Sequence, residues 1–288
     1  MKMSLCSAVL MLLSLGAEGE VVLEDFSKCK ETFLNGPPVF NTKTPSRHVF
    51  ICQKHIKVYR FATRYDSEEK IPVYSAYKYQ VRGDCYMARP QITWMVEPQL
   101  EDKKNGDQMG LQMRMKIEKQ ASNADYKRSK YDKGHLYPFC HTADDDTASS
   151  TFTLTNAAPQ KCDFNWNWYD EVESKVKPIL DDCSNIGKSA YVVTGVVPSK
   201  GNNLLRIGRG VNVPTHFWTA FCCCDNNKKD CTFGGYIMGN NEESSEQFSS
   251  PENFNKKVSN LYQTDNFDVF ANACSLSGNA PAKRPREE

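Results

Sequence analysis

Cysteine is the residue type that most restricts how this chain can fold. The sequence holds 12 cysteines in 288 residues, and one of them, Cys6, lies in a leader that we expect to be removed. A chain that enters an oxidising compartment with the other eleven is expected to form several disulfides. Because eleven is odd, at least one thiol stays free or joins a second chain in a disulfide-linked dimer.

The leader comprises residues 1–19. An apolar run from Ala8 to Leu15 follows a basic start, and Ala17 and Gly19 occupy the −3 and −1 positions of a cleavage site before Glu20. This is the pattern of a secretory signal peptide, and the run is too short to span a bilayer. We therefore predict a secreted, extracellular protein without stable membrane association.

The spacing of the cysteines argues against a zinc site. The sequence contains no CxxC pair, and the run Cys222, Cys223 and Cys224 does not have a zinc-site spacing. On a strand, Cys222 and Cys224 would face one way and Cys223 the other. We therefore expect the three cysteines to serve different partners.

The charge of the chain is balanced overall but uneven along the sequence. The formal net charge is +1, which excludes strong nonspecific clamping of nucleic acid by overall charge. Residues 111–133 nevertheless carry seven basic against three acidic side chains and lead directly into the sequence DKGH. This segment is either a solvated loop or a patch that attracts phosphate.

Strand and helix patterns do not alternate regularly, which predicts an α+β fold. We expect one mixed domain over residues 20–275, with a central, mainly antiparallel sheet flanked by helices, and a disordered tail over 276–288. Residues 190–197 form a continuous apolar run typical of a buried strand. Further strands are predicted over 71–81, 150–156, 215–222 and 233–239, and helices over 165–176, which Pro178 should end or kink, and over 250–263, with Ser250 as N-cap.

Three consecutive stretches, DKGHLYP, TFTLTNAAPQ and FNWNWYDEVE, bring together residues suited to phosphodiester hydrolysis. DKGHLYP supplies a histidine after Gly134, where the backbone can turn freely, and FNWNWYDEVE supplies Asn165 and Glu173. Eight residues on a helix correspond to roughly 80° of rotation and about 12 Å of rise, so these two lie on neighbouring sides. A histidine can deprotonate water, and an amide oxygen can hold Mg²⁺, which together favour metal-assisted hydrolysis.

The ordered set of motifs resembles the DNA/RNA non-specific endonucleases of the ββα-metal type. The stretches that carry the resemblance are RYDSEEKIPVYSAY, DKGHLYP, TFTLTNAAPQ, VVTGVVPS and VPTHFW, and it spans roughly Leu34 to Cys274. It implies a ββα-metal motif and a metal-dependent endonuclease that cleaves DNA and RNA, with Mg²⁺ or Mn²⁺ as cofactor. It also implies that His135 is the general base, that Asn165 is the metal ligand, and that Glu173 holds metal-bound water.

The resemblance implies that Asn156 and Lys133 are also catalytic and that Lys177 and Arg89 bind the substrate. Asn156 matches an asparagine near the scissile phosphate, Lys177 falls where an arginine often assists, and Arg89 is the counterpart of an upstream arginine. Lys133 departs from the family pattern DRGH. Lysine keeps the charge but loses the two-pronged phosphate contact of arginine.

Several alternatives remain open from sequence alone. Asn165 could be a helix cap, Glu173 a solvated side chain, and the Asp144–Asp146 run a solvated loop. His141 and His216 are interpreted as structural. At the level of function, the alternatives are a catalytically weak protein that binds nucleic acid or another polyanion, and a disulfide-linked structural or adhesion module.

Overall fold

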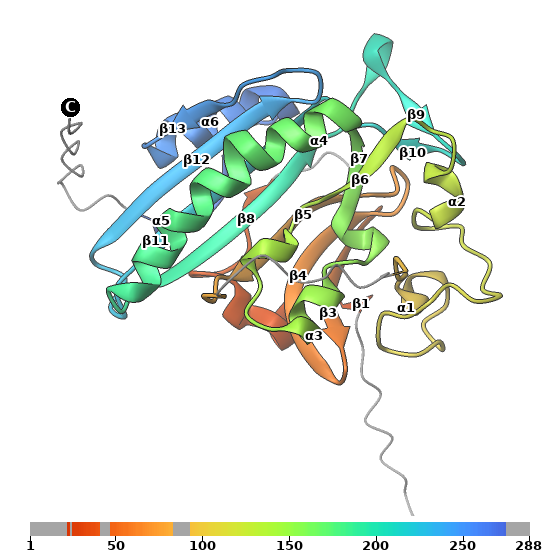
Figure 1. The fold of residues 1–288 in the computed structure, drawn as a ribbon, viewed down its shortest axis with the longest axis horizontal. Helices are drawn as coiled ribbons and strands as arrows, with labels where there is room; N and C mark the ends of the chain where they lie inside the picture. Colours follow the sequence, from red (N-terminus) through yellow and green to blue (C-terminus); the bar gives the residue numbers. More distant parts are fainter. Residues whose placement is uncertain (1–21, 24, 41–46, 83–92, 275–288) are drawn as a thin grey trace, which may run out of the picture.

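An eight-stranded sheet forms the centre of the molecule (Figure 1). The structure is a computed structural model that describes residues 22–23, 25–40, 47–82 and 93–274. Every neighbouring pair of strands in this sheet is antiparallel, as predicted. In spatial order the strands are β1 (Val22–Leu23), β3 (His48–His55), β4 (Val58–Asp66), β5 (Ile71–Lys78), β8 (Ser189–Val197), β11 (His216–Cys224), β12 (Cys231–Gly239) and β13 (Glu246–Phe248).

Helices cover both faces of the sheet. On one face, α4 (Cys162–Trp168), a π-helical turn (Tyr169–Glu173) and α5 (Ser174–Asn185) form one continuous helical run across β8, β11 and β12 (Figure 1). Its apolar side chains recur every four residues and join the core on that face. The other face is covered by α6 (Pro251–Tyr262) and the 3₁₀ helix η1 (Ser27–Thr32).

The remaining elements are short. Two small ribbons pair β2 (Val39–Phe40) with β14 (Phe267–Asp268), and β9 (Arg206–Ile207) with β10 (Val211–Asn212). A third ribbon, described with the site below, lies in the long connection between β5 and β8. The other helices are α1 (Pro98–Glu101), α2 (Asn123–Tyr126) and α3 (Asp145–Ser150), and the other 3₁₀ turns are Phe139–His141, Leu154–Asn156 and Gly201–Asn203.

The prediction of a strand over residues 150–156 was wrong. Helix α3 ends at Ser150, and residues 154–156 form a 3₁₀ turn. The hydroxyls of Ser150 and Thr151 each donate to the carbonyl three residues earlier, at 2.6 and 2.8 Å. Such local bonds compete with strand pairing, so the alternation of threonine and apolar residues was misleading here.

Pro178 does not end the helix, which continues to Asn185. The helix is instead widened upstream, in the π-helical turn that closes at Glu173. A π-helical turn accommodates one extra residue. The angle between Asn165 and Glu173 is therefore close to that of residues seven apart, about 20°, and not the roughly 80° expected for a regular helix. The two side chains share one side of the helical run.

Four disulfides cross-link the described part of the chain, as the cysteine count predicted. They join Cys29 to Cys52, Cys183 to Cys223, Cys222 to Cys274, and Cys224 to Cys231. The three consecutive cysteines of β11 do serve different partners. Cys162 is exposed and is not in a disulfide within the described part of the chain. No helix among the described residues is both long and apolar enough to cross a membrane.

Candidate active site

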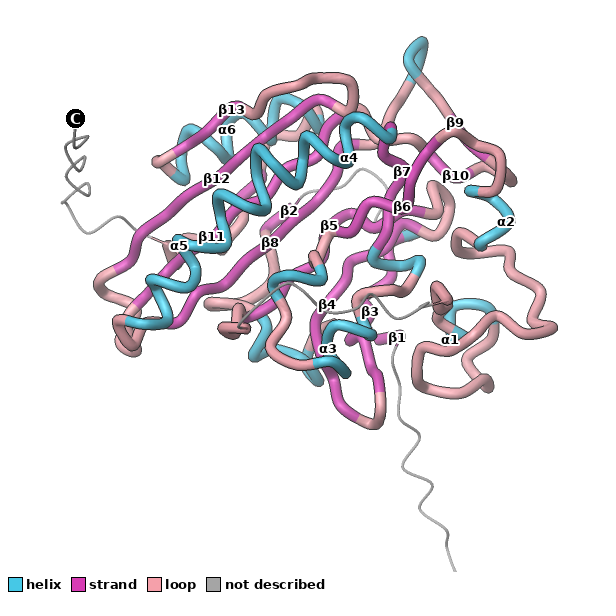
Figure 2. The backbone as a smooth tube through the Cα atoms, viewed as in Figure 1, coloured by secondary structure: helices cyan, strands magenta, loops and turns pink. Residues whose placement is uncertain are grey.

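The DKGH sequence lies on a two-stranded ribbon that runs directly into a helix. Strand β6 (Tyr131–His135) pairs antiparallel with β7 (Ala157–Lys161), and α4 begins at the next residue, Cys162 (Figure 2). The register places Asp132 opposite Gln160 and His135 opposite Ala157. Strand, strand and helix thus form a ββα unit that packs on the helical face of the central sheet.

Lys133 and His135 share one face of β6, because side chains alternate along a strand. The His135 ring packs between Trp94 and Phe152, with centroid distances of 4.7 and 4.6 Å. The Lys133 ammonium lies over the rings of Trp94 and Tyr126, 5.6 and 5.4 Å from their centroids. Burial lowers the pKa of Lys133 below its usual value, since an ammonium is less stable away from water.

Asp132 points to the other face of β6, where α4 packs. The Asn165 amide nitrogen lies 3.4 Å from the Asp132 carboxylate and donates to it, which leaves the amide oxygen directed elsewhere. Opposite Asp132, Gln160 is completely buried, and neither atom of its amide bonds to any residue that the structure describes. Three oxygen-bearing side chains therefore meet between the ribbon and the helix. Sequence analysis identified only Asn165, because the pairing of Asp132 with Gln160 becomes evident only from the strand register.

Gly134 does not mark a turn, contrary to the expectation from sequence. It lies inside β6, and a Cβ atom at this position would fall 2.1 Å from the side-chain carbon and oxygen of the Gln160 amide. The glycine is therefore required because the Gln160 amide occupies the space where a side chain would begin.

Gly134→Ala is expected to destabilise the fold by about 1–3 kcal/mol, the usual cost of an extra methyl group in a packed site. Gln160→Ala removes the clash, so the double variant should lose less stability than the sum of the two single variants. Urea unfolding of the four proteins measures this coupling. Strictly additive losses would contradict the assigned contact.

Glu173 is half-buried and lies beside the loop that follows His135. Its main-chain oxygen is 3.5 Å from His141 Nε2, and the residue lines a small void together with Tyr77 and Trp168. Burial raises the pKa of Glu173 to about 7, opposed in part by a hydrogen bond from the Trp168 indole. The carboxyl group can therefore change its charge near neutral pH.

Asn156 is completely buried and is saturated by backbone bonds. Its side-chain oxygen accepts from Tyr137 N at 3.0 Å, and its nitrogen donates to the carbonyls of Tyr137 and Thr151 at 3.1 and 2.9 Å. The side chain thus ties the end of the β6–β7 connection to the segment that follows His135. In this conformation it is not accessible to a phosphate, and it acts on the site by positioning the backbone around His135.

The remaining candidates lie further along the helical run or outside the described residues. Lys177 forms an ion pair of 2.7 Å with Asp181, which would have to open for a phosphate contact. Arg89 lies outside the described residues. His141 is buried against the Tyr77 hydroxyl at 2.7 Å, and burial lowers its pKa to about 4, so it is a neutral core residue.

The Asp144–Asp146 run is used by the fold. Asp144 accepts from the backbone nitrogen of Thr147 at the start of α3, and Arg60 and Arg82 contact the three acids. A cavity of about 520 Å³ has none of the candidate residues in its lining; Arg47, His48, Asp66 and Tyr262 are among its lining residues.

A ββα unit with a histidine on its first strand and an asparagine on its helix defines a class of metal-dependent nucleases. A sequence model of the DNA/RNA non-specific endonuclease family matches residues 41–275. The chain belongs to this family, as its motifs indicated.

Individual relatives and a solved structure agree with this assignment. The chain is 35% identical over 237 residues to the human endonuclease domain-containing 1 protein, covering 77% of this chain and 43% of that protein. The mouse protein of the same name is 33% identical over 69% of this chain and 39% of its own length. The chain thus spans less than half the length of these relatives.

Human mitochondrial endonuclease G is 32% identical over 108 residues, 34% of this chain and 35% of that protein. A chain in the crystal structure of an EndoG/EndoGI complex superimposes with a TM-score of 0.52 at 19% identity, covering 73% of this chain and 84% of that chain. This likeness shows that the two share a fold.

Proposed function

We propose that this protein is a secreted, Mg²⁺-dependent endonuclease that hydrolyses phosphodiester bonds of DNA and RNA. The observation that carries the proposal is the ββα unit, in which one short strand presents His135 and Lys133 on one face and Asp132, next to Asn165, on the other. A phosphodiester that crosses the end of this strand could be approached from both sides.

His135 is the proposed general base. Its ring is held between two aromatic side chains, which fixes its orientation. A base positioned in this way can take a proton from the attacking water, the step that general-base catalysis accelerates by about 10²–10⁴-fold. Lys133 beside it offers positive charge to the phosphate oxygens, which carry more negative charge in the transition state.

The side chains on the helix face of the ribbon fit a hard divalent cation. Asn165 provides an amide oxygen, Asp132 a carboxylate, and Gln160 a buried amide without a protein partner among the described residues. Oxygen donors of this kind suit Mg²⁺, which keeps several waters and takes phosphate oxygens as ligands. When bound, the ion would supply Lewis-acid stabilisation of the phosphate charge. Asn165 would hold it, and Glu173 would orient water at the site.

Digestion of supercoiled plasmid and of a defined RNA tests the proposal. Cleavage in Mg²⁺, loss of cleavage in EDTA, and loss of cleavage in a His135→Ala variant are expected together. Binding of both nucleic acids without cleavage would instead favour the polyanion-binding function. Recovery of the expressed protein from the culture medium, beginning at Glu20, would support secretion and removal of the leader.

Lys133→Arg is expected to raise the single-turnover cleavage rate several-fold, with a smaller effect on substrate binding. A guanidinium can contact two phosphate oxygens, whereas an ammonium acts as a point charge, and arginine can stack on the same two rings. Lys133→Ala should lower the rate. Cleavage of a labelled duplex by the three proteins gives the order, and a faster rate for lysine than for arginine would show that the pocket is adapted to lysine.

The cleavage rate of the wild type is expected to rise as the pH increases through about 7, where Glu173 loses its proton.

The same carboxyl group should make stability depend on pH. Since the folded state raises the pKa of Glu173 above the usual 4.5, the folded chain binds more protons than the unfolded chain, and the free energy of unfolding falls between about pH 4.5 and 7. Glu173→Gln should remove both effects, and should make the fold more stable at pH 8 by up to about 3 kcal/mol. Rate profiles and urea unfolding at pH 5 and 8 provide the measurements. The same pH dependence in wild type and variant would exclude Glu173 as its source.

A further inference from the structure

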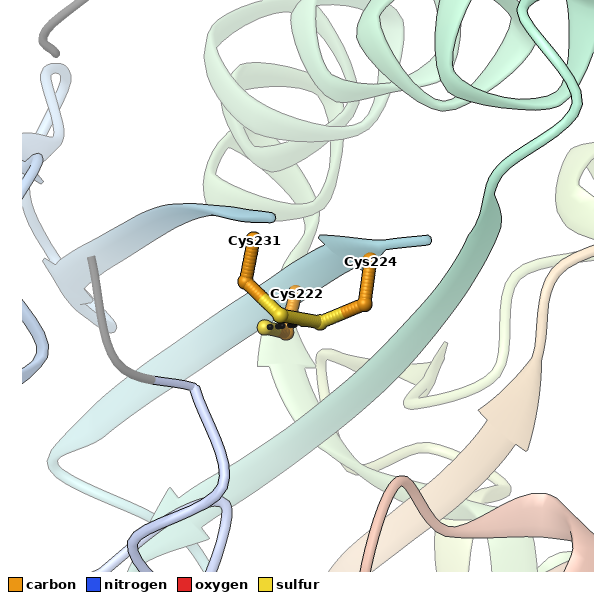
Figure 3. A group of neighbouring side chains, drawn as sticks. All are labelled: Cys222, Cys224 and Cys231. Atoms are coloured by element: carbon orange, nitrogen blue, oxygen red, sulfur yellow. Dashed lines mark hydrogen bonds between the residues drawn. A yellow bond between two sulfur atoms is a disulfide. The ribbon is translucent and has the colours of Figure 1, made fainter. Parts of the chain in front are cut away.

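Four cysteines meet where the β11–β12 hairpin approaches the last described residue. Cys222 and Cys224 project from the same face of β11, and Cys231 lies opposite Cys224 in the register (Figure 3). Cys274, which is bonded to Cys222, ends the described chain. Their two disulfides are in contact, since the Sγ atoms of Cys222 and Cys224 are 3.4 Å apart.

The sulfur atoms are grouped almost as metal ligands would be. Those of Cys222, Cys224 and Cys231 all lie within 4.8 Å of one another, and that of Cys274 is bonded to Cys222. In a tetrahedral thiolate site with metal–sulfur bonds of about 2.3 Å, the sulfur atoms are roughly 3.8 Å apart. Small side-chain rotations would therefore convert two touching disulfides into four ligands. The linear sequence gave no such signal, because Cys231 and Cys274 reach the site only through the fold.

The surroundings favour a metal over separate thiolates. Each of the four cysteines is at most 4% exposed, and they belong to the apolar cluster that also contains Phe233, Phe254 and Phe270. Free thiolates are costly in such a place, whereas a divalent cation compensates half of their charge and the buried setting limits access of competing ligands.

We propose that, when both disulfides are reduced, Cys222, Cys224, Cys231 and Cys274 bind one soft divalent cation, with Zn²⁺ as the natural occupant. Reduction by two equivalents of a phosphine consumes two waters, gives two phosphine oxides and leaves four thiols. Binding of the cation then displaces thiol protons to solvent. The same residues would thus link the end of the domain to the hairpin in both kinds of compartment. The link would be made by disulfides under oxidising conditions and by the bound metal under reducing conditions. This inference is independent of the proposed nuclease activity.

Metal uptake by the reduced protein tests the inference. The folded chain is reduced with a phosphine, which unlike a dithiol competes weakly for metal, then given Zn²⁺ or Cd²⁺ and desalted. We expect about one ion per reduced chain, a thiolate-to-Cd²⁺ charge-transfer absorption in the ultraviolet, and a higher melting temperature than without metal. The oxidised chain, which still carries the exposed Cys162 thiol and the candidate Mg²⁺ site, gives the baseline, and the reduced chain should retain about one ion more.

Alkylation of the reduced wild type identifies the ligands without relying on a variant. Mass spectrometry should show that metal protects Cys222, Cys224, Cys231 and Cys274 from a haloacetamide. The paired variant Cys222→Ser/Cys224→Ser should lose the ion, and the matched control Cys29→Ser/Cys52→Ser, which removes a different disulfide, should keep it. Absence of binding by the reduced wild type, or protection of other cysteines instead, would overturn the proposal.

Discussion

Replacement of His135 by alanine is expected to lower the single-turnover rate of plasmid cleavage on the order of 10²-fold or more. The variant keeps the metal ligands but lacks the group that takes the proton from water, so substrate binding should change far less than the chemical step. The fold should persist, because the core of the central sheet does not depend on this side chain. Cleavage of a labelled duplex under enzyme excess measures the rate directly.

His55→Ala is the matched control for this experiment. His55 ends β3, at a distance in sequence and on a different element from the ββα unit, and it is likewise partly exposed. Its replacement should leave the rate unchanged. If the His135 variant cleaved as fast as the wild type, another group would have to be the base.

Asn165→Ala is expected to raise the Mg²⁺ concentration needed for half-maximal cleavage. The increase should exceed ~10–100-fold, which is what loss of a residue that only supports a metal ligand typically costs. The substitution removes the side-chain amide whose nitrogen donates to Asp132 and whose oxygen is the proposed metal ligand. A second measurement does not require activity: Mg²⁺ should raise the melting temperature of the wild type, and this shift should be lost in the variant.

Asn167→Ala provides the comparison on the same helix. Asn167 lies two residues further along α4 and has a similar, partial exposure, but it points to a different side of the helix. Its variant should show the Mg²⁺ titration curve of the wild type. Overlapping curves for the two variants would rule out Asn165 as the metal ligand.

The sequence predicted the elements whose patterns are strong and local. Strand β8 is a continuous apolar run, and α6 carries its own N-cap, in which Ser250 accepts from the backbone of Asn253 at 3.4 Å. The separation of Cys223 from Cys222 and Cys224 followed from strand alternation alone. These features depend on neighbouring residues only, so a single sequence is sufficient to predict them.

The errors occurred where distant residues decide the local structure. The requirement for glycine at position 134 comes from Gln160 on the partner strand, which no local pattern reveals. The helix continues past Pro178 to Asn185, although a proline normally interrupts one, and a π-helical turn that no local pattern predicted precedes it. The three backbone bonds of Asn156 likewise come from the fold and not from any local pattern, while its role in catalysis stays a prediction.

Strands β5 and β8 are direct neighbours in the sheet, yet the entire candidate site lies in the connection between them, residues 79–188. The candidate site residues are thus distinct from the strands of the central sheet, although the helical run of the connection packs on that sheet. Three of the four disulfides, Cys29–Cys52, Cys222–Cys274 and Cys224–Cys231, have no cysteine in this connection. Substitutions within the connection can therefore change or abolish the chemistry while the sheet remains intact. A lineage could therefore lose catalysis and keep the scaffold, or exchange the connection for one with another specificity.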